Sequence, residues 1–255
     1  MARGQRPTRL PPPFLKRIAF RHDVAIDRSA YPFSLPVLRD DDFEFTFEQS
    51  VTIIVGENGV GKSTLLEAVA ALAGFDQAGG GPGYRPLDHS RALECNGDAL
   101  ASVMRASWLP KVGQGWFFRA ESFFAVARYL DEAARESCAA PPDFLSHSHG
   151  EGFLRFFEER CERRGIFLFD EPESALSPTR QFDFLKLLRR MQAGGETQVI
   201  MATHSPILMA LPGADLVGMT RGGLDRMTLA ETPHYRLIRE FALDPAGTIA
   251  AMLEE

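Results

Sequence analysis

The residues most suited to chemistry in this chain form a glycine-rich segment that contains a lysine. Residues 56–64 read GENGVGKST and satisfy the pattern G-x-x-x-x-G-K-[ST]. In such a loop the glycines let backbone amides face phosphate oxygens, the lysine bridges the β- and γ-phosphates, and the hydroxyl ligates Mg²⁺. The predicted nucleotide-binding residues of this loop are Gly56, Glu57, Asn58, Gly59, Val60, Gly61, Lys62, Ser63 and Thr64.

Two adjacent carboxylates form a second group of candidates. Asp170 and Glu171 follow the apolar run GIFLF, which predicts a buried strand. A carboxylate at the carboxyl end of a parallel strand can reach Mg²⁺ beside a phosphate loop. We therefore predict Ser63 and Asp170 as metal ligands and Glu171 as the group that polarises an attacking water. Glu173 is expected in a solvated turn.

A histidine follows a third apolar run, TQVIMAT. A lone histidine is usually structural, but a strand here would place His204 at the same sheet edge as the carboxylates. One imidazole can then contact a γ-phosphate and the water that attacks it. The predicted catalytic residues are Glu171, His204 and Lys62.

The stretch SHSHGEG, residues 146–152, admits two interpretations. His147 and His149 are spaced as ligands of a metal site on a strand. The same residues also fit a phosphate-binding turn that leads into a helix. The stretch alone does not decide between them.

The order of the strands and helices that must position these residues predicts an α/β fold in one domain. Apolar runs predict strands over 14–20, 43–47, 51–55, 115–121, 165–172 and 197–206, and longer amphipathic runs predict helices over 63–75, 122–137 and 178–195. Residues 76–115 are turn-rich and are expected to form a variable, partly flexible segment.

Composition limits the function classes. The chain has 255 residues, 45% of them hydrophobic, and a net charge of -6, which argues against broad nonspecific binding to nucleic acid. A basic start at residues 3–21 leaves a local DNA contact open. Three scattered cysteines, no signal peptide and no long apolar run predict a cytoplasmic protein without direct membrane insertion.

Taken together, GENGVGKST, SHGEG, FLFDEPESALS and MATHS resemble ABC-class ATPase domains over about residues 14–210. They resemble, in this order, the Walker A loop, the signature motif, the Walker B strand with its glutamate and D-loop, and the switch histidine. Ser148 precedes Asp170 by 22 residues, and Glu171 precedes His204 by 33. The resemblance implies a P-loop NTPase fold with a mixed sheet core, an N-terminal antiparallel β portion and a helical lobe. It places the nucleotide-binding core at 14–75 and 165–255, and the lobe at about 116–164.

The resemblance also implies ATP and Mg²⁺ as cofactors and a head-to-tail homodimer. In it, Ser148 and the Gly150 amide of one subunit would contact the γ-phosphate held by the other, so the phosphate interpretation of SHSHGEG is favoured. Glu121, rather than Gln114, is expected as the Q-loop contact. Tyr31 and Phe33 are candidates to stack on adenine, although core packing is the expected role of both.

Among ABC-class proteins, the chain looks most like small soluble bacterial ATPases related to the recombination-repair (SMC-like) and OLD-type groups. Asp170 follows Lys62 by 108 positions, which is too short a span for a long coiled coil, and no DxD pair of a nuclease follows His204. A GTPase is disfavoured because no Asn/Thr-Lys-x-Asp motif occurs. We therefore expect a regulatory or DNA-repair/defence-related ATPase with a DNA or protein partner. The alternative is the nucleotide-binding subunit of an ABC membrane transporter.

Overall fold

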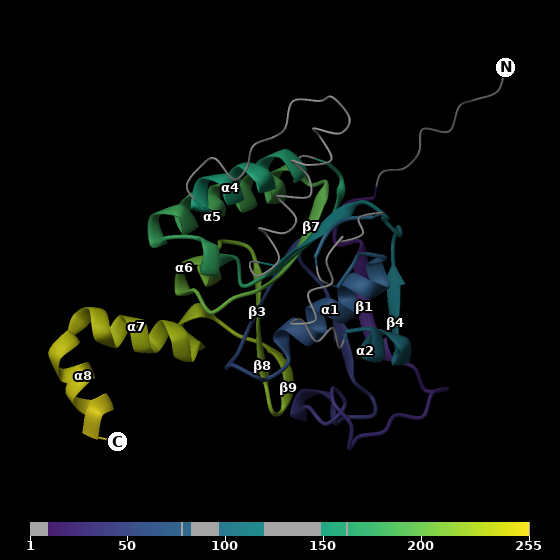
Figure 1. Cartoon of the computed structure of the whole chain (residues 1–255), viewed down its shortest axis with the longest axis horizontal. Coiled ribbons are helices and arrows are strands. Elements are labelled where there is room, and N and C mark those ends of the chain that lie inside the picture. The colour runs from purple at the N-terminus through teal and green to yellow at the C-terminus, as the bar shows by residue number, and fades with distance from the viewer. Residues whose placement is uncertain (1–9, 78, 83–96, 120–148, 162, 255) are drawn as a thin grey trace.

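Two β-sheets and the helices around them make up the structure (Figure 1). The computed structural model describes residues 10–77, 79–82, 97–119, 149–161 and 163–254. The strands are β1 (Leu15–Phe20), β2 (Glu44–Thr46), β3 (Val51–Val55), β4 (Met104–Trp108), β5 (Gly115–Arg119), β6 (Gly165–Asp170), β7 (Thr197–Ala202), β8 (Asp215–Thr220) and β9 (Gly223–Arg226). The helices are α1 (Lys62–Ala73), α2 (Gly97–Val103), α4 (His149–Arg160), α5 (Pro178–Gly194), α6 (Pro206–Met209), α7 (Pro233–Leu243) and α8 (Pro245–Glu254), with short 3₁₀ turns η1 (Pro36–Leu38), η2 (Pro172–Ala175) and η3 (Leu229–Glu231).

The larger sheet positions the predicted site. Its strand order is β5-β6-β7-β3-β8-β9, with β9 antiparallel to β8 and every other pair parallel. Every residue of β3, β6 and β7 is buried, which explains their nearly continuous apolar sequences. Because parallel strands end at a common edge, Val55, Asp170 and Ala202 lead into loops on the same side of the sheet. The predicted α/β P-loop fold with a mixed sheet is confirmed.

The smaller sheet is antiparallel and has the order β2-β1-β4. Its first two strands agree with the predicted N-terminal antiparallel portion. The sequence assigned no helix or strand to residues 76–115, but α2 and β4 lie within that segment and β4 pairs with β1 along its length. The periodicity of MRASW is weak, with only Met104 fully buried, so tertiary pairing rather than sequence pattern defines this strand. Similarly, β5 falls inside the span assigned to the helical lobe, and it belongs to the main sheet.

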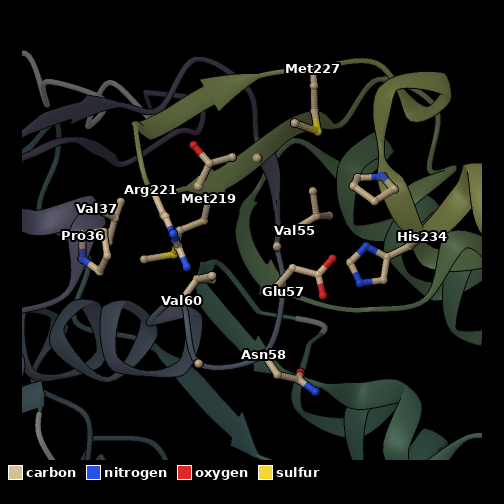
Figure 2. A pocket seen from close by; sticks show the side chains of 15 residues that line it. Pro36, Val37, Val55, Glu57, Asn58, Val60, Met219, Arg221, Met227 and His234 are labelled. Atoms are coloured by element: carbon tan, nitrogen blue, oxygen red, sulfur yellow. The ribbon is translucent and has the colours of Figure 1, made fainter. Parts of the chain in front are cut away.

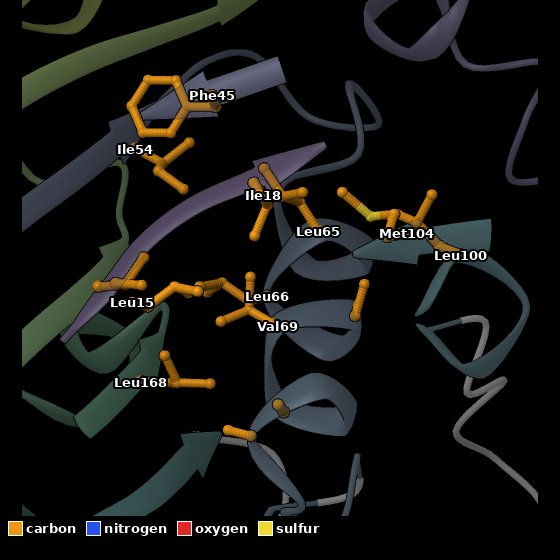
Figure 3. Packing of buried hydrophobic residues seen from close by; sticks show 14 of the residues in the cluster. Leu15, Ile18, Phe45, Ile54, Leu65, Leu66, Val69, Leu100, Met104 and Leu168 are labelled. Atoms are coloured by element: carbon orange, nitrogen blue, oxygen red, sulfur yellow. The ribbon is translucent and has the colours of Figure 1, made fainter. Parts of the chain in front are cut away.

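The core has two parts, one on each face of the larger sheet. Helix α1 packs between the two sheets, where Leu66 and Val69 point toward Leu15 and Ile18 of β1 and Leu168 of β6 (Figure 3). On the opposite face, α4 and α5 lie over the sheet (Figure 1). There the ring of Phe169 lies 5.1 Å from the rings of Phe157 and Phe184, measured between centroids.

The C-terminal helices differ from the rest of the fold. No residue of α7 or α8 is buried, and the pair extends away from the body (Figure 1). Among the described residues, none of the helices has the length and apolar character needed to cross a membrane.

A buried glutamine joins the two sheets. The side-chain oxygen of Gln198 in β7 accepts hydrogen bonds from the backbone N–H groups of Phe14 and Leu15, both at 2.8 Å. Its amide nitrogen donates to the Leu15 carbonyl at 3.0 Å. The side chain is fully buried, so these polar groups have no access to water as a substitute partner.

Replacing Gln198 with leucine keeps the volume of the side chain but leaves those backbone groups unpaired. We expect Gln198→Leu to lower the free energy of unfolding by about 2–4 kcal/mol, since buried unsatisfied polar groups each cost ~1–3 kcal/mol. Urea denaturation monitored by circular dichroism measures this. Gln49→Leu, at an exposed position, is the matched control and should change stability little. Equal stability of the two variants would contradict the bridging role.

Candidate active site

The phosphate-binding loop connects the end of β3 to the start of α1, as the motif predicts. Gly61 caps α1 with φ of 107°, a conformation that L side chains rarely adopt. A Cβ on Gly56 would lie 2.5 Å from the Met219 carbonyl oxygen, so only glycine fits there. Glu57, Asn58 and Gly59 are exposed at the tip of the loop. The loop therefore presents its backbone and the N-terminus of α1 to solvent, an arrangement that favours anions.

Lys62 is folded back into this loop. Its Nζ atom donates to the carbonyl oxygens of Gly56 at 2.8 Å and Glu57 at 3.0 Å, and the residue is only 5% exposed. Burial lowers the pKa of the Lys62 ammonium group, while the carboxylates of Glu171 and Asp170 oppose that shift. The cation is thus held at the mouth of the loop, where phosphate oxygens can replace the two carbonyl groups.

Ser63 and Asp170 meet as the sequence predicts. The Ser63 hydroxyl donates to Asp170 Oδ1 at 3.0 Å. Burial raises the pKa of Asp170 to about 6, although the nearby Arg119 guanidinium and the Ser63 hydrogen bond oppose that shift. A carboxylate and a hydroxyl side by side are hard oxygen donors suited to Mg²⁺, which binds with few protein ligands when phosphates complete its shell. These residues therefore fit a magnesium ion.

Sequence reasoning missed a buried ion pair beside this site. Arg119, the last residue of β5, lies opposite Asp170 in the sheet register, and its Nε atom is 3.5 Å from Asp170 Oδ2. Its Nη1 atom donates to Glu67 Oε1 at 2.8 Å and to the Gln77 carbonyl at 3.2 Å. The sequence does contain one indication of this ion pair: Arg119 is a charged residue at the end of the apolar run GWFF, at the same edge as Asp170.

Glu171 and His204 face each other at the same edge. Glu171 Oε1 lies 3.5 Å from His204 Nε2. Glu171 has φ of 46°, and no other non-glycine residue in the described ranges has a positive φ. Such a conformation costs about 1–2 kcal/mol and is typical of functional sites. Burial and the Lys62 charge lower the pKa of His204, partly opposed by Glu171.

The expectation of a solvated Glu173 was wrong. The residue is half-buried, and its Oε1 atom accepts a hydrogen bond from the backbone N–H of His204 at 2.6 Å. Burial raises the pKa of this carboxyl group. The 3₁₀ turn η2 directs the side chain back toward the end of β7, and no local pattern indicates that direction. Glu173 therefore helps to position the histidine.

A second histidine, also missed from the sequence, lies against the first. His234 on α7 places its Nε2 atom 3.0 Å from His204 Nδ1. With Pro233 it borders a pocket of about 430 Å³ that follows the phosphate-binding loop over Gly56–Val60. Figure 2 shows Glu57 of the loop and His234 facing each other across this pocket. The residue is 30 positions beyond His204 in the chain and belongs to no recognisable motif.

Some of the remaining predicted site residues lie outside the part of the chain that the structure describes. Ser148, His147 and Glu121 lie outside the described residues, and Gly150 lies in the first turn of α4, which begins at His149. Gln114 precedes β5 and therefore lies at the edge opposite Asp170, which removes it as a Q-loop candidate.

The two aromatic candidates for adenine differ clearly. The Tyr31 ring is 52% exposed and its hydroxyl is 2.7 Å from Thr64 Oγ1. Phe33 packs against the core. Only Tyr31 combines a free ring face with a contact to the loop.

A strand–loop–helix unit with Lys62, a Ser63–Asp170 pair and an adjacent Glu171 defines a P-loop ATPase. Comparisons with known proteins agree with that class. Residues 33–92 match a family profile described as an AAA domain. Residues 144–210 match one described as "AAA domain, putative AbiEii toxin, Type IV TA system".

Curated relatives show the family. The chain is 30% identical over 166 residues to the cytochrome c biogenesis ATP-binding export protein CcmA of Rhodopseudomonas palustris, covering 62% of this chain and 79% of that one. It is 28% identical over 197 residues to a probable amino-acid ABC transporter ATP-binding protein, y4tH, of Sinorhizobium fredii, covering 66% and 74%. A solved structure of a putative metal-chelate type ABC transporter aligns over 74% of this chain and 76% of its own, with 19% identity and a TM-score of 0.44. The chain belongs to the ABC-type family of P-loop ATP-binding proteins, and it is an ATP-hydrolysing enzyme.

Lys62→Ala removes the cation at the mouth of the loop. We expect ATP affinity to fall about 100-fold or more, because charged hydrogen bonds to two phosphates are lost. Isothermal titration calorimetry measures this, and Lys111→Ala, at an exposed position outside the loop, is the control. Unchanged affinity in Lys62→Ala would contradict the assignment of the loop.

Proposed function

We propose that two copies of this chain enclose two ATP molecules head to tail, and that ATP hydrolysis releases the copies to drive a membrane transport partner. The observation that supports ATP hydrolysis is the meeting of Lys62, the Ser63–Asp170 pair and the Glu171–His204 pair at one sheet edge. Asp170 and Glu171 come from the end of β6, His204 follows β7, and Lys62 and Ser63 begin α1 after the loop that leaves β3.

Each side chain has a role in this proposal. Glu171 accepts a proton from water, which attacks the γ-phosphorus in line with the leaving oxygen of ADP. Lys62 exchanges its carbonyl partners for phosphate oxygens and balances the developing negative charge. His204 uses its free Nε2 atom to orient the γ-phosphate and the water. Mg²⁺ held by Ser63 and Asp170 would supply further charge neutralisation. Tyr31, which is exposed and contacts Thr64, is the residue we propose to stack on adenine.

The start of α4 supports the proposed dimer. In ABC-class sites the signature of one subunit completes the nucleotide site of the other, and here α4 begins directly after Ser148. The helix N-terminus at His149 and Gly150 favours a γ-phosphate. A two-fold axis would then create two equivalent sites, each incomplete without the second copy. Glu121 is proposed as a contact on the γ-phosphate side.

Glu171→Gln keeps the size of the side chain but removes the base. We expect hydrolysis to slow by about 10²–10⁴-fold while ATP binding survives, so that the variant is a dimer with ATP and a monomer without it. Adding Ser148→Ala to the same chain should weaken that dimer. Multi-angle light scattering of both variants, with and without ATP, measures this. A Glu171→Gln protein that stays monomeric at saturating ATP would exclude the dimer switch.

The proposal of a membrane transport partner is based on the relatives of this chain. Their names describe ATP-binding proteins of an export system in cytochrome c biogenesis and of a probable amino-acid transporter. These names favour the transporter alternative over the DNA-repair hypothesis that the motifs first suggested. A soluble regulatory or defence-related ATPase is the second candidate, because the profile over residues 144–210 carries the description of a putative toxin.

Copurification distinguishes the two candidates. A tagged chain carrying Glu171→Gln, isolated from native cells with ATP and mild detergent, should retain an integral membrane protein identified by mass spectrometry. The same isolation with Lys62→Ala should lose that protein if retention depends on the nucleotide state. Recovery of the homodimer alone, fully active without detergent, would favour the regulatory candidate.

A further inference from the structure

His234 is held firmly although its helix is otherwise exposed. Thr232, which is fully buried, caps α7 by accepting from the Tyr235 N–H at 3.3 Å and donates its own hydroxyl to the Leu229 carbonyl at 2.8 Å. Pro233 follows as the first helical residue, a position that suits its fixed φ. The first turn of α7 is therefore anchored beside the phosphate-binding loop, and it carries His234 to His204.

The contact between the two imidazoles constrains their protons. Nitrogens 3.0 Å apart share one proton, so one ring donates and the other accepts. The other nitrogen of His204, Nε2, faces the Glu171 carboxylate at 3.5 Å and has no hydrogen-bond partner within the described part of the chain. A carboxylate accepts but does not donate, so it favours a proton on His204 Nε2. In a neutral His204 ring, Nδ1 is then the acceptor.

We propose that His234 is a positioning residue, whose Nε2–H donates to His204 Nδ1 and so holds His204 in the tautomer that presents Nε2–H to the γ-phosphate. The inference rests on the proposed role of His204 in hydrolysis. The wrong tautomer would present a lone pair to phosphate oxygens, which repel it. The partner of a working imidazole commonly sets which nitrogen carries the proton. The charged groups Lys62, Glu171 and Glu57 also act on His204, and His234 contacts the ring nitrogen on the side away from Glu171.

The hydrogen bond between His234 and His204 links α7 to the edge of the sheet that carries Glu171. Within the described residues, this contact joins the anchored first turn of a largely exposed helix to the end of β7. A change in the position of α7 would therefore alter the orientation of His204 without altering the phosphate-binding loop itself. The link predicts an effect on hydrolysis and little effect on ATP binding.

Steady-state kinetics and calorimetry test whether His234 affects ATP hydrolysis but not ATP binding. We expect His234→Ala to lower kcat by about 10–100-fold, a usual range when the partner of a functional histidine is lost, with the ATP dissociation constant changed less than about threefold. His234→Gln, whose amide N–H can donate from a similar position, should recover most of the rate. The double variant His204→Ala/His234→Ala should be no slower than His204→Ala. His22→Ala, which removes an exposed imidazole, is the matched control, and circular dichroism verifies folding of each variant.

A spectroscopic measurement tests the tautomer without hydrolysis. In nucleotide-free protein with ¹⁵N-labelled histidine, the six histidines can be assigned by single substitutions. We expect His204 as the Nε2–H tautomer, a mixture of tautomers in His234→Ala, and the single tautomer again in His234→Gln. An Nδ1–H tautomer in the unaltered protein would overturn the inference, as would a His234→Ala enzyme of full rate when His204→Ala is slow. Full rate in His204→Ala would instead overturn the proposed role of His204.

Discussion

The burial of Asp170 is the constraint on which the site depends. A carboxylate with 6% exposure at the end of β6 has lost most of its hydration, and an isolated buried charge is costly. Arg119, itself buried, offsets part of that cost, and Glu67 in turn balances Arg119. This explains why charged residues occur inside α1 and at the end of an otherwise aromatic strand. The ion pair keeps an acidic oxygen next to Ser63, where a cation with phosphates can bind.

The parallel sheet turns this constraint into a catalytic edge. Because β3, β6 and β7 are neighbours and run in the same direction, their carboxyl ends bring Lys62, Glu171 and His204 together from distant parts of the chain. The left-handed backbone of Glu171 turns the chain sharply after Asp170. As a result, the Asp170 carboxylate contacts Ser63, whereas the Glu171 carboxylate faces His204. Glu173 then returns to hold the backbone of His204. Hydrogen bonds to the Asp170 carboxylate and to the backbone N–H of His204 thus support this edge.

The C-terminal helices add a connection to this edge. Apolar residues such as Leu237, Phe241 and Leu253 remain exposed on α7 and α8, while the first turn of α7 is anchored by Thr232. Within the described residues, a hydrogen bond between the imidazoles of His234 and His204 links that anchored turn to the site. Such contacts are sensitive to small displacements, because hydrogen bonds weaken steeply with distance and angle.

The amino-acid sequence by itself determined the fold class and the phosphate-binding loop, and it placed Ser63, Asp170 and Glu171 at one edge of the sheet, because those residues are adjacent to strong local patterns. It also predicted β1, β3, β6, α1 and α5 with nearly correct ends, and Gly74 and Gly195 close the two helices in left-handed conformations. The predicted strand over 197–206 ends earlier, at Ala202. Only the tertiary structure decided that β4 joins β1, that Arg119 pairs with Asp170, and that His234 contacts His204. Those pairings join residues 30 to more than 80 positions apart, and no local periodicity encodes which distant side chain will meet another once the sheet is assembled.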